Sequence, residues 1–346
     1  MSAPAPAERI PEMPQRPPAI SYSQATQKCG YALGFYRERA TKGPPNAALL
    51  VGRAVHAGIQ FHLAFGDTTQ AVNEDGELVP VDPAQRAVEV ALLEFETEVE
   101  REGGQGVVRW DEPHRLTRAG EVYRSDRGRI PSYEFGLQVV GLEVMAWCER
   151  FPGLRATSFE RPFRVDIGNG WACSGRLDVE TDVLAVDAWE VARVRPGPDA
   201  PEVLSCVLDL KTAADPWDVE GKELEKLEQA VLYQYARVLE DGRPPDLFAY
   251  HVIPHTGLQL RTLTFEATND VDVMADGFDA SAIQVIPVEY DEEVIERVLE
   301  HRLAPTIRAI EADALVPNTS GWWHSEKFCD YWEACPLGAA ARRRTT

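Results

Sequence analysis

The spacing of apolar residues predicts helices in the first half of the chain. Segments with apolar side chains at intervals of three and four residues are typical of amphipathic helices that lay one face on a core. The expected helices are residues 25–37, 49–65, 83–101 and 132–150. Ser21 or Ser23 is expected to cap the first of them, and a Gly-Pro-Pro turn precedes the second.

The pattern changes to strict alternation after a Phe-Pro-Gly turn at residues 151–153, which indicates strands. The later elements are strands at 158–167, 171–180 and 203–212, a helix at 220–240, a strand at 247–253 and a long helix at 291–314. Helices followed by strands, and then by helix and strand again, predict an α/β or α+β fold with a helical N-terminal portion.

Composition favours one compact architecture. The chain has 346 residues, 44% of them hydrophobic, without an internal repeat. We expect residues 1–18, rich in Pro and Ala, to be a disordered lead and residues 19–346 to form a single domain with a helical region at 66–150. No stretch approaches the roughly 20 apolar residues of a membrane span, and the start is unlike a secretory signal. Six scattered cysteines fit a reducing cytoplasm.

The net charge of −21 argues at first against nucleic acid as a partner. Its distribution weakens that argument, because residues 1–60 carry seven Lys or Arg against three acids and Arg342–Arg344 add a basic end. The acidic middle of the chain fits a site where carboxylates hold cations, although an acidic soluble surface is the commoner cause.

Candidate chemistry lies in the strands. In VLDLKT, residues 207–212, Asp209 and Lys211 share one strand face while their neighbours fill the other. Asp178 ends the preceding strand, so two carboxylates and an ammonium group are expected at one sheet edge. Oxygen ligands of this kind suit Mg²⁺ or Mn²⁺. Asp-x-Lys alone is a weak signal, and a salt bridge on the strand surface is the alternative.

Two features of the predicted helices indicate a site only when they are considered together with Asp209 and Lys211. Gln229 and Tyr233 are spaced i and i+4, so an amide and a phenol lie on one helix face. His56 stands in an apolar helical stretch, where a lone histidine is more often a core residue than a ligand.

Taken in order, these residues resemble the RecB-type branch of the PD-(D/E)xK nuclease superfamily, which includes CRISPR-adaptation exonucleases. The matching motifs are Ser21-Tyr22-Ser23 with Cys29, Gly52 to His56, Gly175 to Asp178, Asp209 to Lys211, and Gln229 to Tyr233. The resemblance implies a restriction-endonuclease-like mixed central sheet flanked by helices.

The resemblance also implies residue roles. It makes His56, Asp178, Asp209 and the carbonyl of Leu210 ligands of one or two Mg²⁺ or Mn²⁺ ions. Lys211 would be the catalytic lysine. Gln229 and Tyr233 would support the site and the DNA strand. Residues 179–208 are longer than the short hairpin usual in the family. Their ends have the pattern of strands, and we expect an extended loop or flap beside the site.

A second constellation occupies the C-terminal segment 315–340. Relatives with an iron–sulfur cluster combine a cysteine near the N-terminal helix with three near the C-terminus. Here Cys29, Cys329 and Cys335 fall at such places, with His324 where the remaining cysteine would be expected. This set predicts a [4Fe–4S] cluster or Zn²⁺, and a relic without metal is the alternative.

Other residues have ordinary explanations beside functional ones. The remaining cysteines, Cys148, Cys173 and Cys206, are expected to be small buried residues. Glu160 is either a further metal neighbour or a surface carboxylate. The aromatic residues Trp322, Trp323 and Trp332 would stack on bases or shield a metal. No P-loop, dinucleotide-binding motif or nucleophile elbow occurs in the chain, so unwinding driven by ATP is unsupported.

We therefore expect a metal-dependent deoxyribonuclease that trims single-stranded DNA ends, in recombination, repair, CRISPR adaptation or phage DNA processing. The alternative is a nuclease-fold binding or scaffold subunit with little activity alone. A third possibility is a subunit that is active only when a helicase or an annealing protein delivers DNA. No membrane partner is expected.

Overall fold

The computed structural model describes residues 18–26, 29–38, 43–68, 70–72, 76–218, 224–265 and 270–316, together with residues 318, 329, 331, 335 and 337.

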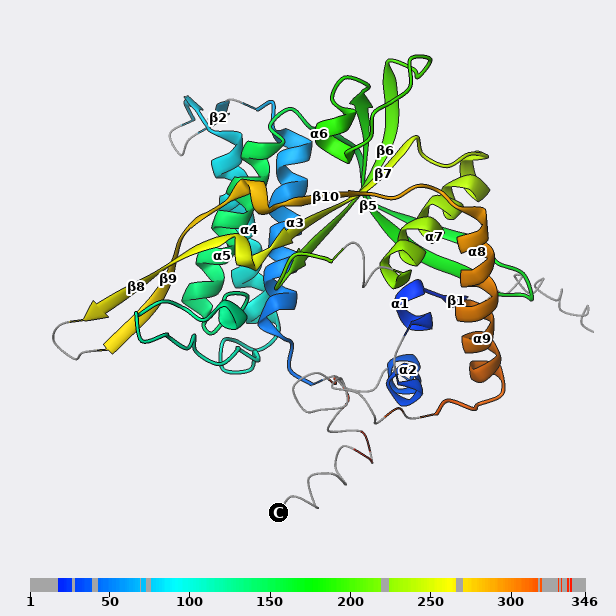
Figure 1. The fold of residues 1–346 in the computed structure, drawn as a ribbon, viewed down its shortest axis with the longest axis horizontal. Helices are drawn as coiled ribbons and strands as arrows, with labels where there is room; N and C mark the ends of the chain where they lie inside the picture. Colours follow the sequence, from blue (N-terminus) through cyan, green and yellow to red (C-terminus); the bar gives the residue numbers. More distant parts are fainter. Residues whose placement is uncertain are drawn as a thin grey trace, which may run out of the picture.

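A mixed six-stranded sheet forms the centre of the molecule (Figure 1). Its strands are β1 (Ala19–Ile20), β4 (Ala156–Asp166), β5 (Ala172–Leu184), β6 (Val203–Ala213), β7 (Leu247–Pro254) and β10 (Gln284–Pro287). They lie in the order β1-β5-β6-β7-β10, with β4 also paired to β5. The β1–β5 and β6–β7 pairs are parallel, whereas β4–β5, β5–β6 and β7–β10 are antiparallel. The expected mixed α/β sheet is confirmed.

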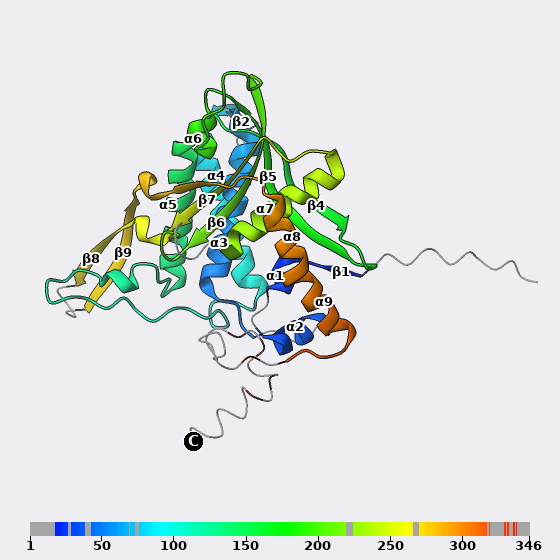
Figure 2. The same cartoon turned by 45° about the vertical axis from the view of Figure 1, so that its right-hand side comes forward.

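Helices flank the sheet as two groups. They are α1 (Tyr22–Ala25), α2 (Gly30–Arg37), α3 (Ala47–Phe65), α4 (Pro83–Arg101), α5 (Tyr133–Arg150), α6 (Ala188–Ala192), α7 (Leu224–Asp241), α8 (Glu292–Val298) and α9 (Ala304–Glu311). Figures 1 and 2 show α3, α4 and α5 on one side of the sheet and α7, α8 and α9 on the other. Each group buries its own hydrophobic core against the sheet.

Alternation along β6 supplies both cores. Leu208 and Leu210 belong to the core shared with α3 to α5, while Val207 belongs to the core shared with α7 to α9. Asp209 and Lys211 follow Val207 on the α7 side, as the period of two requires. The polar pair therefore starts where the apolar residues of that strand face end.

Two hairpins stand outside the central sheet. They are β2 (Gln70–Val72) with β3 (Leu78–Pro80), and β8 (Leu258–Phe265) with β9 (Asp270–Phe278). The sequence pattern did not predict them, nor the short edge strands β1 and β10. The region 66–150 is accordingly not wholly helical, because it holds β2, β3 and an irregular stretch between α4 and α5.

The helix α3 is the one described helix that is long and apolar enough to cross a membrane. Nine of its residues are buried, and it lies in the core with α4 and α5. This burial accounts for its apolar composition, because a buried core helix can have the same length and hydropathy as a membrane-spanning helix.

The helices predicted over 49–65, 83–101 and 132–150 are observed as α3, α4 and α5. The prediction of one helix over 25–37 is wrong, because α1 and α2 are separate. Ser21 forms a capping box with Gln24 at the start of α1. Cys29 is extended, with φ −129° and ψ 120°, so the backbone is not helical where α2 begins.

The last helix, expected over 291–314, is continuous but contains a π turn, η4 (Leu299–Leu303). Pro305 follows directly at the start of α9. Proline has no backbone N–H and cannot continue the regular hydrogen-bond ladder. A local π turn is a common adjustment to such a defect.

The insertion expected over 179–208 has strands at its ends, as predicted, but it does not form a loop or flap beside the candidate site. Its ends extend β5 and β6 as a regular antiparallel ladder from Val179↔Leu208 to Leu184↔Val203, and residues 185–202 connect them. The short helix α6 closes the hairpin, and its Ala188 is fully buried. The insertion thus continues the sheet away from the candidate site, because the added residue pairs follow Asp178 along β5 and precede Asp209 along β6.

Close helix contacts make one glycine of α3 critical. A Cβ added at Gly58 would lie 2.7 Å from the Cβ of Ala91 and 2.8 Å from the carbonyl oxygen of Ala87. We predict that Gly58→Ala lowers the free energy of unfolding by about 1–3 kcal/mol in urea denaturation, because the backbone of α4 cannot move aside cheaply. Gly141→Ala is the matched helical control, since its nearest atom would be 3.6 Å away, and it should stabilise by about 0.5–1 kcal/mol. Equal stability of the two variants would contradict the packing.

Candidate active site

The candidate site lies where β5 changes partners. At its start β5 pairs with β1 through Ala172 and Cys173, and from Val179 onward it pairs with β6. The segment Gly175–Asp178 lies between these two pairings. The motif thus occupies a fork at which the edge of β6 is free of β5.

Asp178 ties the fork together. The register Val179↔Leu208 would place Asp178 opposite Asp209 one step further on, but the ladder stops before that pair. Instead the Asp178 Oδ2 atom accepts a hydrogen bond from the backbone N–H of Leu210 at 3.1 Å. A carboxylate thereby satisfies a backbone donor that the sheet leaves unpaired.

Lys211 joins the two acids. Its Nζ forms an ion pair with Asp209 Oδ1 and lies 3.8 Å from Asp178 Oδ2. Burial alone would lower the pKa of Lys211, but Asp209 and Asp178 together raise it above the usual lysine range. The lysine is therefore held charged between two carboxylates.

Asp209 is the buried member of this group, with 1% of its surface exposed. Burial raises the pKa of Asp209 to about 7, and nearby Asp178 adds to the rise while Lys211 opposes it. Among the described residues the Asp209 Oδ2 atom has no hydrogen-bond partner. A buried oxygen without a partner is costly in a folded protein, and a bound cation would satisfy it.

His56 approaches from α3. A Cβ added at Gly52, one turn earlier, would lie 2.8 Å from the Thr212 side-chain oxygen, so glycine lets α3 come close to β6. Burial lowers the pKa of His56 to about 4, with Lys211 contributing further. The backbone of Leu210 forms a hydrogen bond with the ring, and Asp209 interacts with it electrostatically. The imidazole is thus neutral at neutral pH, as a metal ligand must be.

Gln229 and Tyr233 form the wall contributed by α7. The Gln229 side-chain amide donates to the Tyr233 hydroxyl at 2.9 Å, as their i, i+4 spacing predicted. Tyr233 lies edge-on to Phe163 at 5.4 Å, and a Cβ added at Gly175 would lie 2.5 Å from the Phe163 ring. The absence of a side chain at Gly175 makes room for these rings beside the fork.

Sequence reasoning missed Tyr250. The parallel register of β6 with β7 pairs Asp209 with Tyr250, and Lys211 Nζ lies 6.0 Å from the centre of its ring. Burial raises the pKa of Tyr250 above its usual range, and Asp209 contributes to the rise. The available signal was a tyrosine in the mostly apolar stretch LFAYHVI. Which residue of β6 lies beside it depends on the order of the strands in the sheet, which the sequence does not give.

The donor set fits a divalent cation, although the described part of the chain holds no ready-made cluster of three or more His, Cys, Asp or Glu side chains around an ion position. The ammonium group of Lys211 lies between the two carboxylates in this structure. The unsatisfied Asp209 oxygen, the neutral His56 ring and the Asp178 carboxylate are the groups that would hold a metal.

The second constellation is described only in part, since His324 lies outside the described residues. Cys29 accepts a hydrogen bond from the backbone N–H of Asn318 at 3.5 Å, which joins the start of α2 to the C-terminal segment. Cys335 is buried, and Cys329 is partly exposed. The three cysteines do not form a metal-binding group among the described residues.

The other candidates are also placed. Glu160 lies on β4 opposite Asp178, since its two neighbours on β4 pair with the two neighbours of Asp178 on β5. Its backbone φ is 45°, and its carboxylate lies 3.6 Å from Arg176 and 3.2 Å from Gln60. These polar contacts match the surface-carboxylate alternative.

The cysteines expected in the core, Cys148, Cys173 and Cys206, are buried as predicted. The Trp322, Trp323, Trp332 and Arg342–Arg344 side chains lie outside the described residues.

Comparison with known proteins adds little. No family model matches the chain, and no curated protein matches it. One solved structure, a crystal structure of SSO0001, aligns with 12% identity and a TM-score of 0.23 over 52% of this chain and 61% of that one. The chain thus matches about three fifths of that protein's length, and a likeness this distant supports no statement about fold or function.

We predict that Mn²⁺ raises the thermal unfolding temperature of the wild-type protein and that Asp209→Ala abolishes this rise. Ligand that binds only the folded state stabilises it by about 2.7 kcal/mol at a hundredfold excess over Kd. Asp182→Ala, which removes an exposed acid from the same strand as Asp178, is the control and should keep the full effect. Thermal scans with and without Mn²⁺ measure this. An undiminished rise in Asp209→Ala would place the cation elsewhere.

Proposed function

We propose that this protein is a metal-dependent nuclease that hydrolyses phosphodiester bonds of DNA, most readily at single-stranded ends. The observation that carries the proposal is the convergence of Asp178, Asp209, Lys211 and His56 at one open strand fork. These side chains come from three elements far apart in the sequence. Their meeting, rather than any one motif, supports a chemical site.

The residues suggest distinct tasks. Asp209, Asp178 and His56 would hold a divalent cation, which when bound would activate water and neutralise charge on phosphate. Lys211 is kept protonated by its two carboxylate neighbours, so it can place positive charge on a phosphoryl oxygen in the transition state. Gln229 orients the Tyr233 hydroxyl beside this group, which favours a role in positioning the DNA strand.

The preference for single-stranded ends, and a place in recombination, repair, CRISPR adaptation or phage DNA processing, rest on the resemblance to RecB-type nucleases. A cytoplasmic location belongs to the same proposal and is supported by six cysteines that form no disulfide in the described structure. A scaffold subunit that acts with a helicase or annealing partner is the second candidate. The intact Asp209-x-Lys211 pair favours the enzyme.

We expect wild-type protein to degrade end-labelled single-stranded DNA with Mn²⁺ or Mg²⁺ and to be inactive with chelator. Asp209→Ala and Lys211→Ala should each lower the rate at least about 10²–10³-fold, because each removes a group that acts on the transition state. Only Asp209→Ala should also lose stabilisation by Mn²⁺, since Lys211 is not a proposed ligand. Gel analysis of 5′- and 3′-labelled strands and duplexes gives rate and polarity.

The Asp182→Ala protein serves as the activity control and should match the wild type. Equal degradation by Asp209→Ala and wild type would reveal a contaminating nuclease and remove the proposal. An inactive wild type that still binds Mn²⁺ would favour the scaffold alternative.

For the C-terminal segment we propose a structural metal, either a [4Fe–4S] cluster or Zn²⁺, on Cys29, His324, Cys329 and Cys335. The contact between Cys29 and the Asn318 backbone supports it, because it brings the N-terminal cysteine to the C-terminal segment. We expect anaerobically purified protein to contain iron or zinc by elemental analysis, with brown colour in the iron case. Cys29→Ser should lose the metal, and Cys148→Ala should retain it. Metal-free wild type would contradict the site.

A further inference from the structure

A short hairpin rich in arginine lies outside the candidate active site. Residues 113–130, called here the arginine hairpin, contain a β-bridge between Leu116 and Val122. Backbone hydrogen bonds from Thr117 to Glu121 and from Tyr123 to Arg115 hold its two arms together. The hairpin is therefore a formed element, although it belongs to no sheet.

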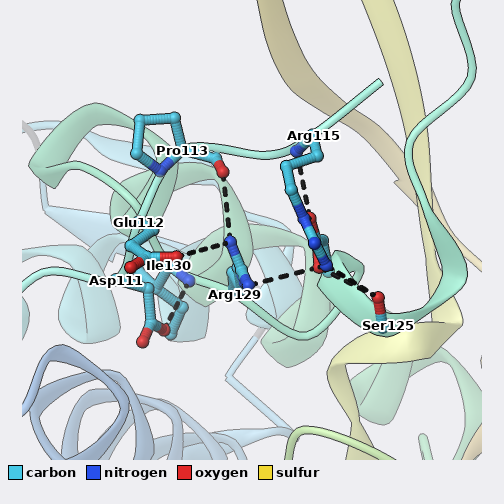
Figure 3. A network of polar contacts seen from close by, with 8 residues as sticks. Asp111, Glu112, Pro113, Arg115, Ser125, Arg129 and Ile130 are labelled. Carbon is cyan, nitrogen blue, oxygen red and sulfur yellow. Dashed lines mark hydrogen bonds and ion pairs between the residues drawn. The ribbon is translucent and has the colours of Figure 1, made fainter. Parts of the chain in front are cut away.

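A buried carboxylate fixes the hairpin (Figure 3). Asp126 is fully buried and accepts hydrogen bonds from the Arg115 side chain at 2.8 Å through each of its two oxygens. Ser125 donates to the same carboxylate, and Arg129 lies 3.3 Å away. The Arg115 hydrogen bonds, foremost among these contacts, hold the pKa of Asp126 well below its usual range. The carboxylate thus stays ionised and clamped at neutral pH.

This clamp divides the arginines into two sets. Five arginines stand between residues 113 and 130 against two acids, Glu121 and Asp126. Arg115 and Arg129 are taken up by Asp126 and by Glu112 at the base of the hairpin. The other three are exposed and have no ion pair among the described residues. They are Arg118, Arg124 and Arg127.

The hairpin contacts the strand that carries the candidate site. A Cβ added at Gly128 would lie 2.7 Å from the carbonyl oxygen and 2.9 Å from the Cα of Ala214, which follows the end of β6. Ala214 is three residues beyond Lys211. The base of the hairpin is therefore anchored beside the end of the strand that carries Asp209 and Lys211, in a chain whose overall charge is −21.

A cavity of about 620 Å³ separates the hairpin from β8 and the turn before it. Arg127 lines it from the hairpin side, and Arg261 lines it from β8. This volume falls within the usual range for sites that enclose a small molecule, roughly 300–1,000 Å³. Arg261 is balanced by Asp276 at 3.3 Å, and the acidic residues Glu121 and Asp279 also line the cavity, so its lining carries no net positive charge. The positive charge is therefore supplied by the arginines on the exposed surface of the hairpin and not by this cavity.

We propose that the arginine hairpin binds the phosphate backbone of a single DNA strand and delivers it to the Asp209–Lys211 site. The role as a delivery surface rests on the proposed nuclease function. Arg118, Arg124 and Arg127 contact phosphates. Tyr123 is 47% exposed and lies under the Arg115 guanidinium at 5.6 Å, so its ring offers a stacking surface for a base. Basic side chains interleaved with an aromatic ring are the usual means of holding single strands without sequence preference.

The test compares the triple variant Arg118→Ala/Arg124→Ala/Arg127→Ala with a control of equal charge change, Arg86→Ala/Arg195→Ala/Arg243→Ala. Binding of a fluorescein-labelled oligothymidylate is measured by anisotropy in chelator, where no cleavage occurs, at several salt concentrations. The hairpin variant should bind about 10–100-fold more weakly than wild type. The slope of the logarithm of its DNA association constant against the logarithm of the salt concentration should be shallower by about 2, because three phosphate contacts are lost. The control should resemble wild type in both.

Two further readouts separate this inference from the proposed function. Hydrolysis of the small substrate bis(p-nitrophenyl) phosphate should be equal in the hairpin variant and wild type, because it does not reach the hairpin. If wild type cleaves DNA and the hairpin variant binds it as tightly as the control does, the hairpin inference is overturned and the nuclease proposal stands. If wild type cleaves neither substrate but binding still depends on the hairpin, the nuclease proposal fails and the DNA-binding surface stands.

Discussion

The hydrogen bond from the Leu210 backbone to the Asp178 carboxylate is the contact on which the candidate site depends. It replaces a ladder bond at the point where β5 and β6 part, so the two strands remain together while the sheet opens. The opening leaves room for Lys211 to bridge Asp178 and Asp209, and for His56 to reach the backbone of Leu210 from α3. A regular ladder through this point would use that N–H within the sheet and separate the acid from it.

The burial of Asp209 shows the energetic tension that such a site holds. A carboxylate with 1% exposure is stable in the folded chain only with compensation, and Lys211 provides part of it. The second oxygen remains unsatisfied within the described structure. Stability alone would be served as well by apolar residues, since replacing buried ion pairs in this way is often neutral or favourable. The arrangement is better explained by a need for charge at this position.

The sequence predicted the elements with strong periodicity and most of the residues that meet at the fork. Helices α3, α4 and α5 and strands β4 to β7 follow from apolar spacing, and the Gln229–Tyr233 pair follows from helical geometry. Prediction failed where tertiary contacts decide. The two-residue strand β1 has too little pattern to detect. The turn residues between β5 and β6 predicted a connection there, but they could not show that it lies away from the site. Tyr250 lies beside Asp209 only because β6 and β7 are neighbours in the sheet, and the clamp at Asp126 depends on the hairpin turn that brings Arg115 to it.

The most direct measurement of the central claim is the anomalous scattering of crystals grown with Mn²⁺. The account predicts an anomalous peak coordinated by the Asp178 and Asp209 carboxylates and the His56 ring, with the Lys211 ammonium group beside it. Well-ordered crystals at saturating Mn²⁺ that show no peak at the fork, with Lys211 still joined to Asp209, would contradict it. The four side chains would then form a structural ion-pair cluster.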